Sequence, residues 1–114
     1  MANPAKAKGT SFENEVCELL RTIWPDTDRA KAGHPSHDFH GPPFPIEAKH
    51  RARWAIPDWV RRIKVVAGGD DRWALVVASG DRRKAGSAGT LMVVDISFGM
   101  ELLRAWHDGL SADG

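Results

Sequence analysis

One short segment of this sequence contains residue types that can bind a metal ion and activate water. Asp38 comes before the turn-forming sequence Gly41-Pro42-Pro43, and Glu47 and Lys49 come after it. Residues 44–51 alternate between apolar and polar side chains in the manner of a β-strand, so Glu47 and Lys49 are expected on the same side. A hairpin at the turn would carry Asp38 back toward Glu47.

Two carboxylates and an ammonium group that meet at one point suit a hard divalent cation. Oxygen ligands hold such a cation, and a lysine beside it can position a water molecule or offset developing negative charge. The chemistry that this arrangement indicates is metal-assisted hydrolysis of a phosphodiester. The ordinary alternative is a surface hairpin that carries a cross-strand ion pair.

A third carboxylate precedes this segment on a predicted helix. Apolar residues at helical spacing predict a helix from Thr10 to about Ile23, and Thr10 with Glu13 has the pattern of a capping box. Glu13 lies about 50° from the centre of the apolar stripe, whereas Glu15 and Glu18 lie well outside it. Glu13 is therefore expected to face the fold, either as a cap alone or also as a member of the metal site.

The remaining pattern predicts an α/β protein. A helix that joins two strands indicates a crossover, and hence a mixed sheet with helices packed on it. The predicted elements are short strands at 27–31, 37–40 and 44–51, a helix from Pro57 to the stop at Gly68-Gly69, buried strands at 73–78 and 90–96, and a last helix from Ser97 through Trp106. The expected organisation is a flexible lead-in over 1–9, one domain over 10–107 and a frayed tail over 108–114.

Length and composition limit the class of protein. With 114 residues the chain can form one small domain with a modest core. It has no apolar run near the ~18 residues of a membrane span, and residues 1–8 lack the apolar core of a signal peptide. Cys17 is the only cysteine, which excludes an internal disulfide and fits a reducing compartment. We therefore expect a cytoplasmic protein, in a bacterial or phage-infected cell, without a membrane partner.

Basic residues concentrate in the middle of the chain, although the net charge is only +1. Between positions 29 and 64 they outnumber the acidic residues, which there include Asp38 and Glu47 of the expected metal site. A basic region around carboxylates indicates a polyanionic substrate, and a solvated charged surface is the ordinary alternative. The candidate phosphate contacts are Arg29, Lys31, His50, Arg51, Arg53, Arg61, Arg62, Arg82, Arg83 and Lys84.

Three short motifs, taken together, resemble those of a known group of nucleases. They are Lys8-Gly9-Thr10-Ser11-Phe12-Glu13-Asn14-Glu15, the Gly33 turn before Asp38, and Ile46-Glu47-Ala48-Lys49. The combination looks like the PD-(D/E)XK nuclease superfamily, and within it is most similar to the small archaeal-type Holliday junction resolvases. The resemblance extends over roughly residues 8–96, although its diagnostic motifs occupy only a small part of that range.

The resemblance implies roles for the individual residues. Asp38 and Glu47 would ligate Mg²⁺, which Mn²⁺ would be able to replace, and the carbonyl of Ala48 would be a further ligand. Lys49 would orient or activate the attacking water. Glu13 would complete the acidic cluster, through a metal-bound water. The metal would polarise the scissile phosphate and stabilise the transition state.

The resemblance also implies a fold, a partner and a function. The fold would be a restriction-endonuclease-like mixed sheet flanked by helices, in the order α-β-β-β-α-β-β-α, and the protein would act as a homodimer. The expected function is Mg²⁺-dependent, structure-selective cleavage of branched DNA, most specifically Holliday junction resolution in DNA recombination and repair. The alternatives are another small endonuclease of the superfamily, acting on duplex, flap or mismatched DNA, and a catalytically silent DNA-binding module.

The sequence departs from the family pattern at two points. His37 stands where the family name implies proline, and the chain contains no glutamine, so the helical Gln of some branches is absent. A cluster of histidines also surrounds the motif, but Gly33 and the turn at 41–43 exclude a regular helical His pair, which favours phosphate contact or loop surface over zinc. These histidines are His34, His37, His40 and His50. For Trp54, stacking on a base and packing at a dimer interface both remain open.

Overall fold

The computed structural model describes the backbone of residues 4–30 and 38–113 and the side chains of residues 11–30 and 38–110. Lys31, Gly33, His34 and His37 lie outside the described residues. In chain order the elements are α1 (Pro4–Arg21), β1 (Asp28–Arg29), β2 (Phe39–His40), β3 (Ile46–His50), α2 (Ile56–Ala67), β4 (Ala74–Ala78), β5 (Thr90–Val94) and α3 (Ile96–Asp113). None of the helices in the described ranges is long and apolar enough to span a membrane.

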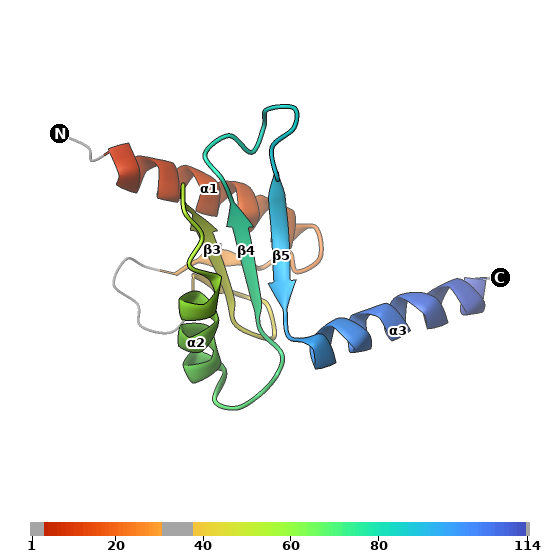
Figure 1. Cartoon of the computed structure of the whole chain (residues 1–114). Helices are drawn as coiled ribbons and strands as arrows, with labels where there is room; N and C mark the ends of the chain where they lie inside the picture. The colour runs from red at the N-terminus through yellow and green to blue at the C-terminus, as the bar shows by residue number, and fades with distance from the viewer. Residues whose placement is uncertain (1–3, 31–37, 114) are drawn as a thin grey trace.

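A mixed three-stranded sheet with the order β3-β4-β5 forms the centre of the molecule (Figure 1). β3 runs parallel to β4, with Ala48 beside Val76, and β5 is antiparallel to β4. Parallel neighbours require a crossover, and α2 provides it between β3 and β4. β1 and β2 pair antiparallel in a separate two-stranded ribbon. The prediction of a mixed sheet flanked by helices is confirmed.

The two faces of the sheet carry separate apolar clusters. On one face, Phe12 of α1 clusters with Ile46 and Ala48 of β3. On the other face, Ile63 of α2 clusters with Leu75 of β4. Because alternate residues of a strand point to opposite faces, β4 contributes to both clusters and is buried throughout, as predicted for 73–78.

α1 is longer at its start than the sequence predicts. It begins at Pro4 rather than at Thr10, because residues 4–8 combine a proline at the first position with the strong helix formers Ala and Lys. Thr10 and Glu13 therefore lie inside the helix, and their interpretation as a capping box is wrong. The helix ends at Arg21.

α2 follows the sequence prediction closely at both ends. Pro57 lies in its first turn, where the absent N–H of proline costs no hydrogen bond. At the other end Gly68 has a φ of 63° and donates its N–H to the carbonyls of Lys64 and Val65. This left-handed C-cap suits glycine, because glycine has no Cβ to oppose a positive φ.

β5 is more exposed than predicted. The apolar run 90–96 suggests a buried strand, but the side chains of Leu91 and Met92 are exposed. The reason is that β5 lies at the edge of the sheet, where β4 is its one neighbouring strand among the described residues.

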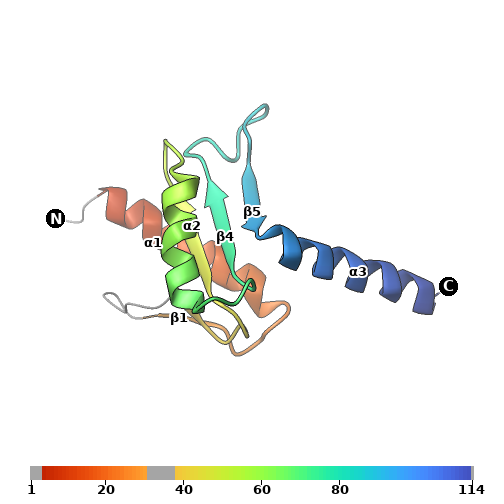
Figure 2. The ribbon, with the colours of Figure 1, turned by 60° about the horizontal axis from the view of Figure 1, so that its bottom comes forward.

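α3 begins at Ile96, one residue before the predicted start at Ser97, and is capped by Asp95. The Asp95 Oδ2 accepts the N–H of Ser97 at 2.9 Å, and the Asp95 carbonyl accepts the N–H of Gly99 at 2.8 Å. The helix continues to Asp113, across a stretch expected to be a frayed tail. Figures 1 and 2 show that it projects away from the sheet, with the C-terminus at its far end.

We expect Ile63→Ala to lower the free energy of unfolding by about 2–5 kcal/mol, because Ile63 is fully buried between α2 and the sheet and the truncation leaves a cavity. Val65→Ala, in the same helix but 80% exposed, should change it by less than about 0.5 kcal/mol. Urea unfolding of both variants checks this, and equal losses would show that α2 does not pack as described.

Candidate functional site

Asp38 is held at the edge of β3 by two hydrogen bonds. Its Oδ2 accepts the N–H of Ala48 at 2.8 Å, and its own N–H donates to the carbonyl of Ile46 at 3.4 Å. The turn after β2 thus carries Asp38 back to β3, toward Glu47, as the sequence predicts. The regular hairpin predicted between these two strands is wrong, however, because β2 forms its ladder with β1.

The carbonyl of Ala48 points to the same edge of β3 as the Asp38 carboxylate. In a β-strand the N–H and C=O of one residue point to the same side, and the N–H of Ala48 is bonded to Asp38. β3 is an end strand of its sheet, so within the described part of the chain this side carries no further strand of that sheet. The carbonyl expected as an additional metal ligand therefore faces the side on which Asp38 lies.

The turn that carries Asp38 depends on Gly41. Its φ is 113°, a backbone conformation that residues with a Cβ rarely adopt. A Cβ at this position would also lie 2.7 Å from the Cα of Thr27. The turn therefore packs directly on the backbone at Thr27, and the placement of Asp38 depends on what holds Thr27.

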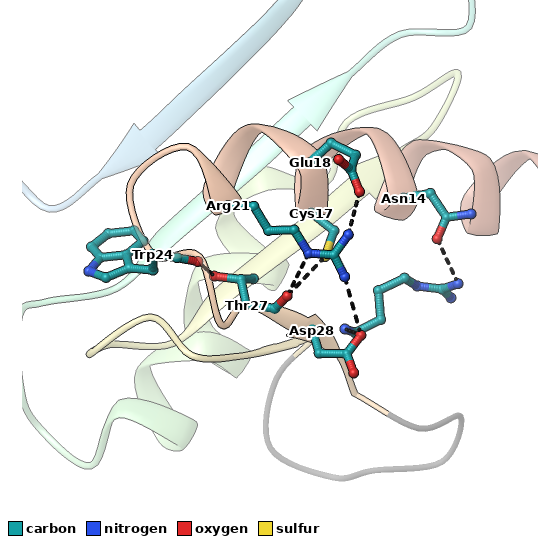
Figure 3. A network of polar contacts seen from close by, with 8 residues as sticks. Asn14, Cys17, Glu18, Arg21, Trp24, Thr27 and Asp28 are labelled. Carbon is teal, nitrogen blue, oxygen red and sulfur yellow. Dashed lines mark hydrogen bonds and ion pairs between the residues drawn. The ribbon is translucent and has the colours of Figure 1, made fainter.

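Thr27 is fixed against α1 by a group of polar contacts (Figure 3). Its carbonyl accepts a hydrogen bond from Arg21 Nε at 2.8 Å and lies 3.8 Å from Cys17 Sγ, and its hydroxyl donates to the carbonyl of Trp24 at 2.6 Å. Burial raises the pKa of the Cys17 thiol, as expected for a cysteine that packs in the core. The C-terminal half of α1 thus positions the turn and, through it, Asp38.

Glu47 and Lys49 lie on the face of β3 that α2 covers. They alternate with Ile46 and Ala48, which belong to the opposite cluster, and the Lys49 Nζ lies 6.0 Å from the ring centroid of Trp59 in α2. Partial burial raises the pKa of Glu47, the charge of Lys49 lowers it, and the charge of Asp38 raises it. Glu47 therefore lies within electrostatic reach of both.

The pKa of Asp38 is raised as well. Burial is the main cause, the hydrogen bond from Ala48 acts in the opposite direction, and the charge of Glu13 raises the pKa further while that of Lys49 lowers it. Asp38 thus couples electrostatically to Glu13, Lys49 and Glu47, the other residues singled out in the sequence. We refer to Glu13, Asp38, Glu47 and Lys49 as the acidic site.

Glu13 has a partner that the sequence analysis did not assign to it. Arg29, expected as a phosphate contact, forms an ion pair with Glu13 at 2.8 Å and donates to Asn14 Oδ1 at 3.0 Å. The Arg29 Nε is buried and has no hydrogen-bond partner among the residues that the structure describes. Its charge also lowers the pKa of Asp38. The signal for such a pair in the sequence was that the predicted strand 27–31, which precedes Asp38, carries the basic residues Arg29 and Lys31.

The donor set fits a cation bound by few protein ligands. Among the described residues, no group of three or more His, Cys, Asp or Glu side chains lies close enough to hold a metal ion. Asp38 and Glu47 are partly buried, and neither forms an ion pair with another described residue. Mg²⁺ in proteins is often bound by one or two carboxylates, with water and substrate phosphate as the other ligands. Asp38, Glu47 and the Ala48 carbonyl would provide a ligand set of this kind.

The candidate phosphate contacts divide into two groups. Arg82 is largely engaged with the protein, because its side chain is 12% exposed, pairs with Glu15 at 3.1 Å and lies over the ring of Phe12. Arg83 also pairs with Glu15. Arg62 is exposed on α2, and its charge lowers the pKa of Glu47. The other exposed candidates are Arg51, Arg53, Arg61 and Lys84, of which Arg61 pairs with Asp58.

His50 and Trp54 pack within the fold. His50 Nε2 lies 3.1 Å from the carbonyl of Ser79 and 3.1 Å from Arg82 Nη1, and its ring packs against Phe12. Trp54 is partly buried and packs on the cluster beneath α2. His50 thus connects the end of β3 to the loop after β4.

We compared the chain with protein-family models, with curated proteins and with solved structures, and found no match in any of the three comparisons.

We expect Asp38→Asn to stabilise the protein at neutral pH. The folded state raises the pKa of Asp38 above its ordinary value of 3.8, so the ionised group is less favourable there than in the unfolded chain. Asparagine can still accept the Ala48 N–H through its carbonyl oxygen. The advantage should be complete above the folded-state pKa and vanish as the pH falls below the unfolded value, because Asp38 is then protonated.

Urea unfolding of wild type and Asp38→Asn between neutral and acidic pH measures this difference. Asp26→Asn, which alters an exposed carboxylate, serves as the control and should show no such pH-dependent gain. A loss of stability in Asp38→Asn at neutral pH would mean that ionised Asp38 stabilises the fold.

Proposed function

We propose that this protein is a Mg²⁺-dependent endodeoxyribonuclease of the PD-(D/E)XK type, and that it cleaves branched DNA such as a four-way junction. The observation that carries the proposal is the convergence of Asp38, Glu47 and Lys49 at β3. Asp38 reaches this strand from a separate ribbon through its hydrogen bond with Ala48. Partly buried carboxylates beside a lysine are costly for stability and suit metal-assisted phosphodiester hydrolysis.

Each residue of the acidic site has a role in this proposal. Asp38, Glu47 and the Ala48 carbonyl would hold Mg²⁺, which when bound polarises the scissile phosphate and offsets the charge that develops on it. Lys49 is held beside Glu47 and would donate a hydrogen bond to the attacking water or to a phosphate oxygen. Glu13 would act indirectly, because its carboxylate is already paired with Arg29.

The substrate assignment is supported by the basic residues next to the site. Arg62 lies within electrostatic reach of Glu47, and exposed arginines follow β3 at Arg51 and Arg53. Cationic side chains of this kind contact the phosphates of any DNA strand and give affinity without reading the sequence. Selectivity for branches, recombination and repair as the pathway, and a homodimeric enzyme are taken from the family resemblance.

A second candidate is a catalytically silent DNA-binding module. The observation that favours it is the ion pair between Arg29 and Glu13, which places a protein cation in the acidic site. In such a module the arginine would replace the metal, and the basic surface would still bind DNA. The cleavage experiment below separates the two candidates.

We expect the wild-type protein to cut a labelled four-way junction in Mg²⁺ and to be inactive in EDTA. Glu47→Gln should lower cleavage by roughly a hundredfold or more, because it removes a metal-binding carboxylate. DNA binding should persist or tighten, since the change also removes a negative charge that repels phosphate. Asp71→Asn, at an exposed carboxylate outside the site, is the matched control and should cut normally.

A linear duplex of the same sequence tests selectivity in the same assay. Cleavage of the junction alone supports a resolvase, and cleavage of both substrates leaves a less selective nuclease. Binding without cleavage in either Mg²⁺ or Mn²⁺ would reject the enzyme and leave the silent module. Loss of binding together with cleavage in Glu47→Gln, with an unchanged circular dichroism spectrum, would contradict the role given to Glu47.

Arg62→Ala should weaken binding to all DNA substrates alike. If Arg62 neutralises one phosphate, the slope of log K against log salt concentration should become shallower by about 1. Arg104→Ala, on the far helix α3, should leave the slope unchanged. Binding titrations at several salt concentrations measure both, and an unaltered slope for Arg62→Ala would remove α2 from the DNA interface.

A further inference from the structure

α3 presents an apolar stripe to the solvent. At about 100° per residue, six of its large apolar side chains fall within one half of the helix circumference, in which His107 also lies. All of them are substantially exposed, with 60% exposure for Leu103 and 67% for Trp106. The stripe consists of Ile96, Met100, Leu102, Leu103, Trp106 and Leu110.

The opposite side of α3 attaches the helix to the rest of the protein. Phe98 is buried and meets the ring of Phe44 edge-on at 4.9 Å. Glu101 accepts two hydrogen bonds from Arg72, at 2.9 and 3.2 Å. Because these anchors lie on the other side of the helix, the apolar stripe faces away from the sheet. The helix projects from the body in both views (Figures 1 and 2).

The shape of the molecule agrees with this arrangement. The radius of gyration is 15.2 Å, whereas a compact chain of this length would have about 13 Å. An exposed apolar helix that extends a molecule in this way leaves a surface of the kind that mediates association.

We propose that the apolar stripe of α3 is a homodimer interface, in which α3 of a second copy of the chain packs antiparallel to it about a two-fold axis at Leu103. The proposal concerns assembly alone and does not depend on the nuclease assignment. It supplies a specific surface for association, on a helix that contributes no residue to the acidic site.

The spacing of the stripe is self-complementary. Met100 and Trp106 lie at equal distances before and after Leu103, and Ile96 and Leu110 lie at equal larger distances. In an antiparallel pair centred on Leu103, Met100 comes level with Trp106 of the second copy, and Ile96 with Leu110 of the second copy. A two-fold interface requires that each contact occur twice in this reciprocal way. Antiparallel packing also places the helix dipoles in a favourable relation.

The exposed area of the stripe is of the order that a stable dimer needs. The exposed surface of its six residues is roughly 700 Å² per chain, which is the most that a second copy could cover and is close to the ~800 Å² per partner of a standard interface. Trp106, the largest of them, is of the residue type that most often dominates the binding energy of an interface.

The polar side of α3 argues against a membrane surface as the occupant. Helices that lie on anionic bilayers are rich in Lys and Arg on their polar face. Here that face carries Glu101, Arg104 and Asp108, so acidic residues outnumber basic ones. This charge does not oppose the approach of a second copy of the chain, because the apolar stripes would meet and the polar faces would stay in solvent.

Sedimentation equilibrium of the full chain tests the proposal. Wild type should be a dimer, and Leu103→Glu should weaken dimerisation by roughly a hundredfold, because two like charges would face each other at the two-fold axis. Arg104→Glu, on the polar side, is the matched control and should remain dimeric. Circular dichroism and thermal unfolding show whether each variant is folded, which we expect because Leu103 is exposed within one chain.

A cross-linking experiment tests the direction of the helices and does not depend on the charge variant. Ile96→Cys and Leu110→Cys proteins are mixed and treated with a short bis-maleimide, with Cys17 left in place because it is buried. The mixture should give a covalent dimer that neither protein gives alone. Wild type under the same conditions controls for reaction at Cys17.

Three results would overturn the proposal. The first is a monomeric wild type at concentrations of tens of micromolar, and the second is a dimer that persists in Leu103→Glu. The third is cross-linking of Ile96→Cys or Leu110→Cys with itself in place of the mixed product, which would indicate parallel helices. If wild type stays monomeric but binds vesicles of anionic lipid, the stripe is a membrane surface and the dimer is rejected.

Discussion

The hydrogen bond between the Asp38 carboxylate and the Ala48 N–H is the contact on which the acidic site depends. Asp38 and Glu47 belong to segments that share no strand ladder in the described ranges, since β2 pairs with β1 and β3 pairs with β4. This contact, together with the weaker backbone bond to Ile46, joins the two segments. It also uses the open edge of β3, where an unpaired backbone N–H would otherwise need a partner.

Partial burial of Asp38 and Glu47 favours binding of a cation at the site and lowers the stability of the fold when both are ionised. Burial raises the pKa values of Asp38 and Glu47. In such surroundings an ionised carboxylate is stabilised by a nearby cation. Lys49 supplies one from the same strand, and Arg29 supplies another through Glu13. These two cations come from different segments, so the charge balance of the site depends on the position of β1 as well as on β3. A divalent ion would enter a region whose negative charge is already partly neutralised.

The sequence predicted those parts of the fold that depend on local chemistry. The alternation of 44–51, the ends of α2 and the convergence of Asp38 on Glu47 all follow from periodicity and from turn-forming residues. The Arg29–Glu13 pair was not predicted, because it joins β1 to α1 across a distance in sequence that no local pattern encodes. The exposure of β5 and of α3 was also missed, since apolarity alone does not distinguish a core element from a surface that meets another molecule.

Gly41 has no functional group, yet the geometry of the whole site depends on it. It lies against the backbone of Thr27, which Arg21 and Cys17 hold to α1. The last step of this path, from Thr27 to Gly41, passes through close-packed backbone atoms, where no side chain of Gly41 can absorb a displacement. A shift of Thr27 would consequently be transmitted to the turn that carries Asp38. The precision of the site is set in a helix that contributes only one of its four members.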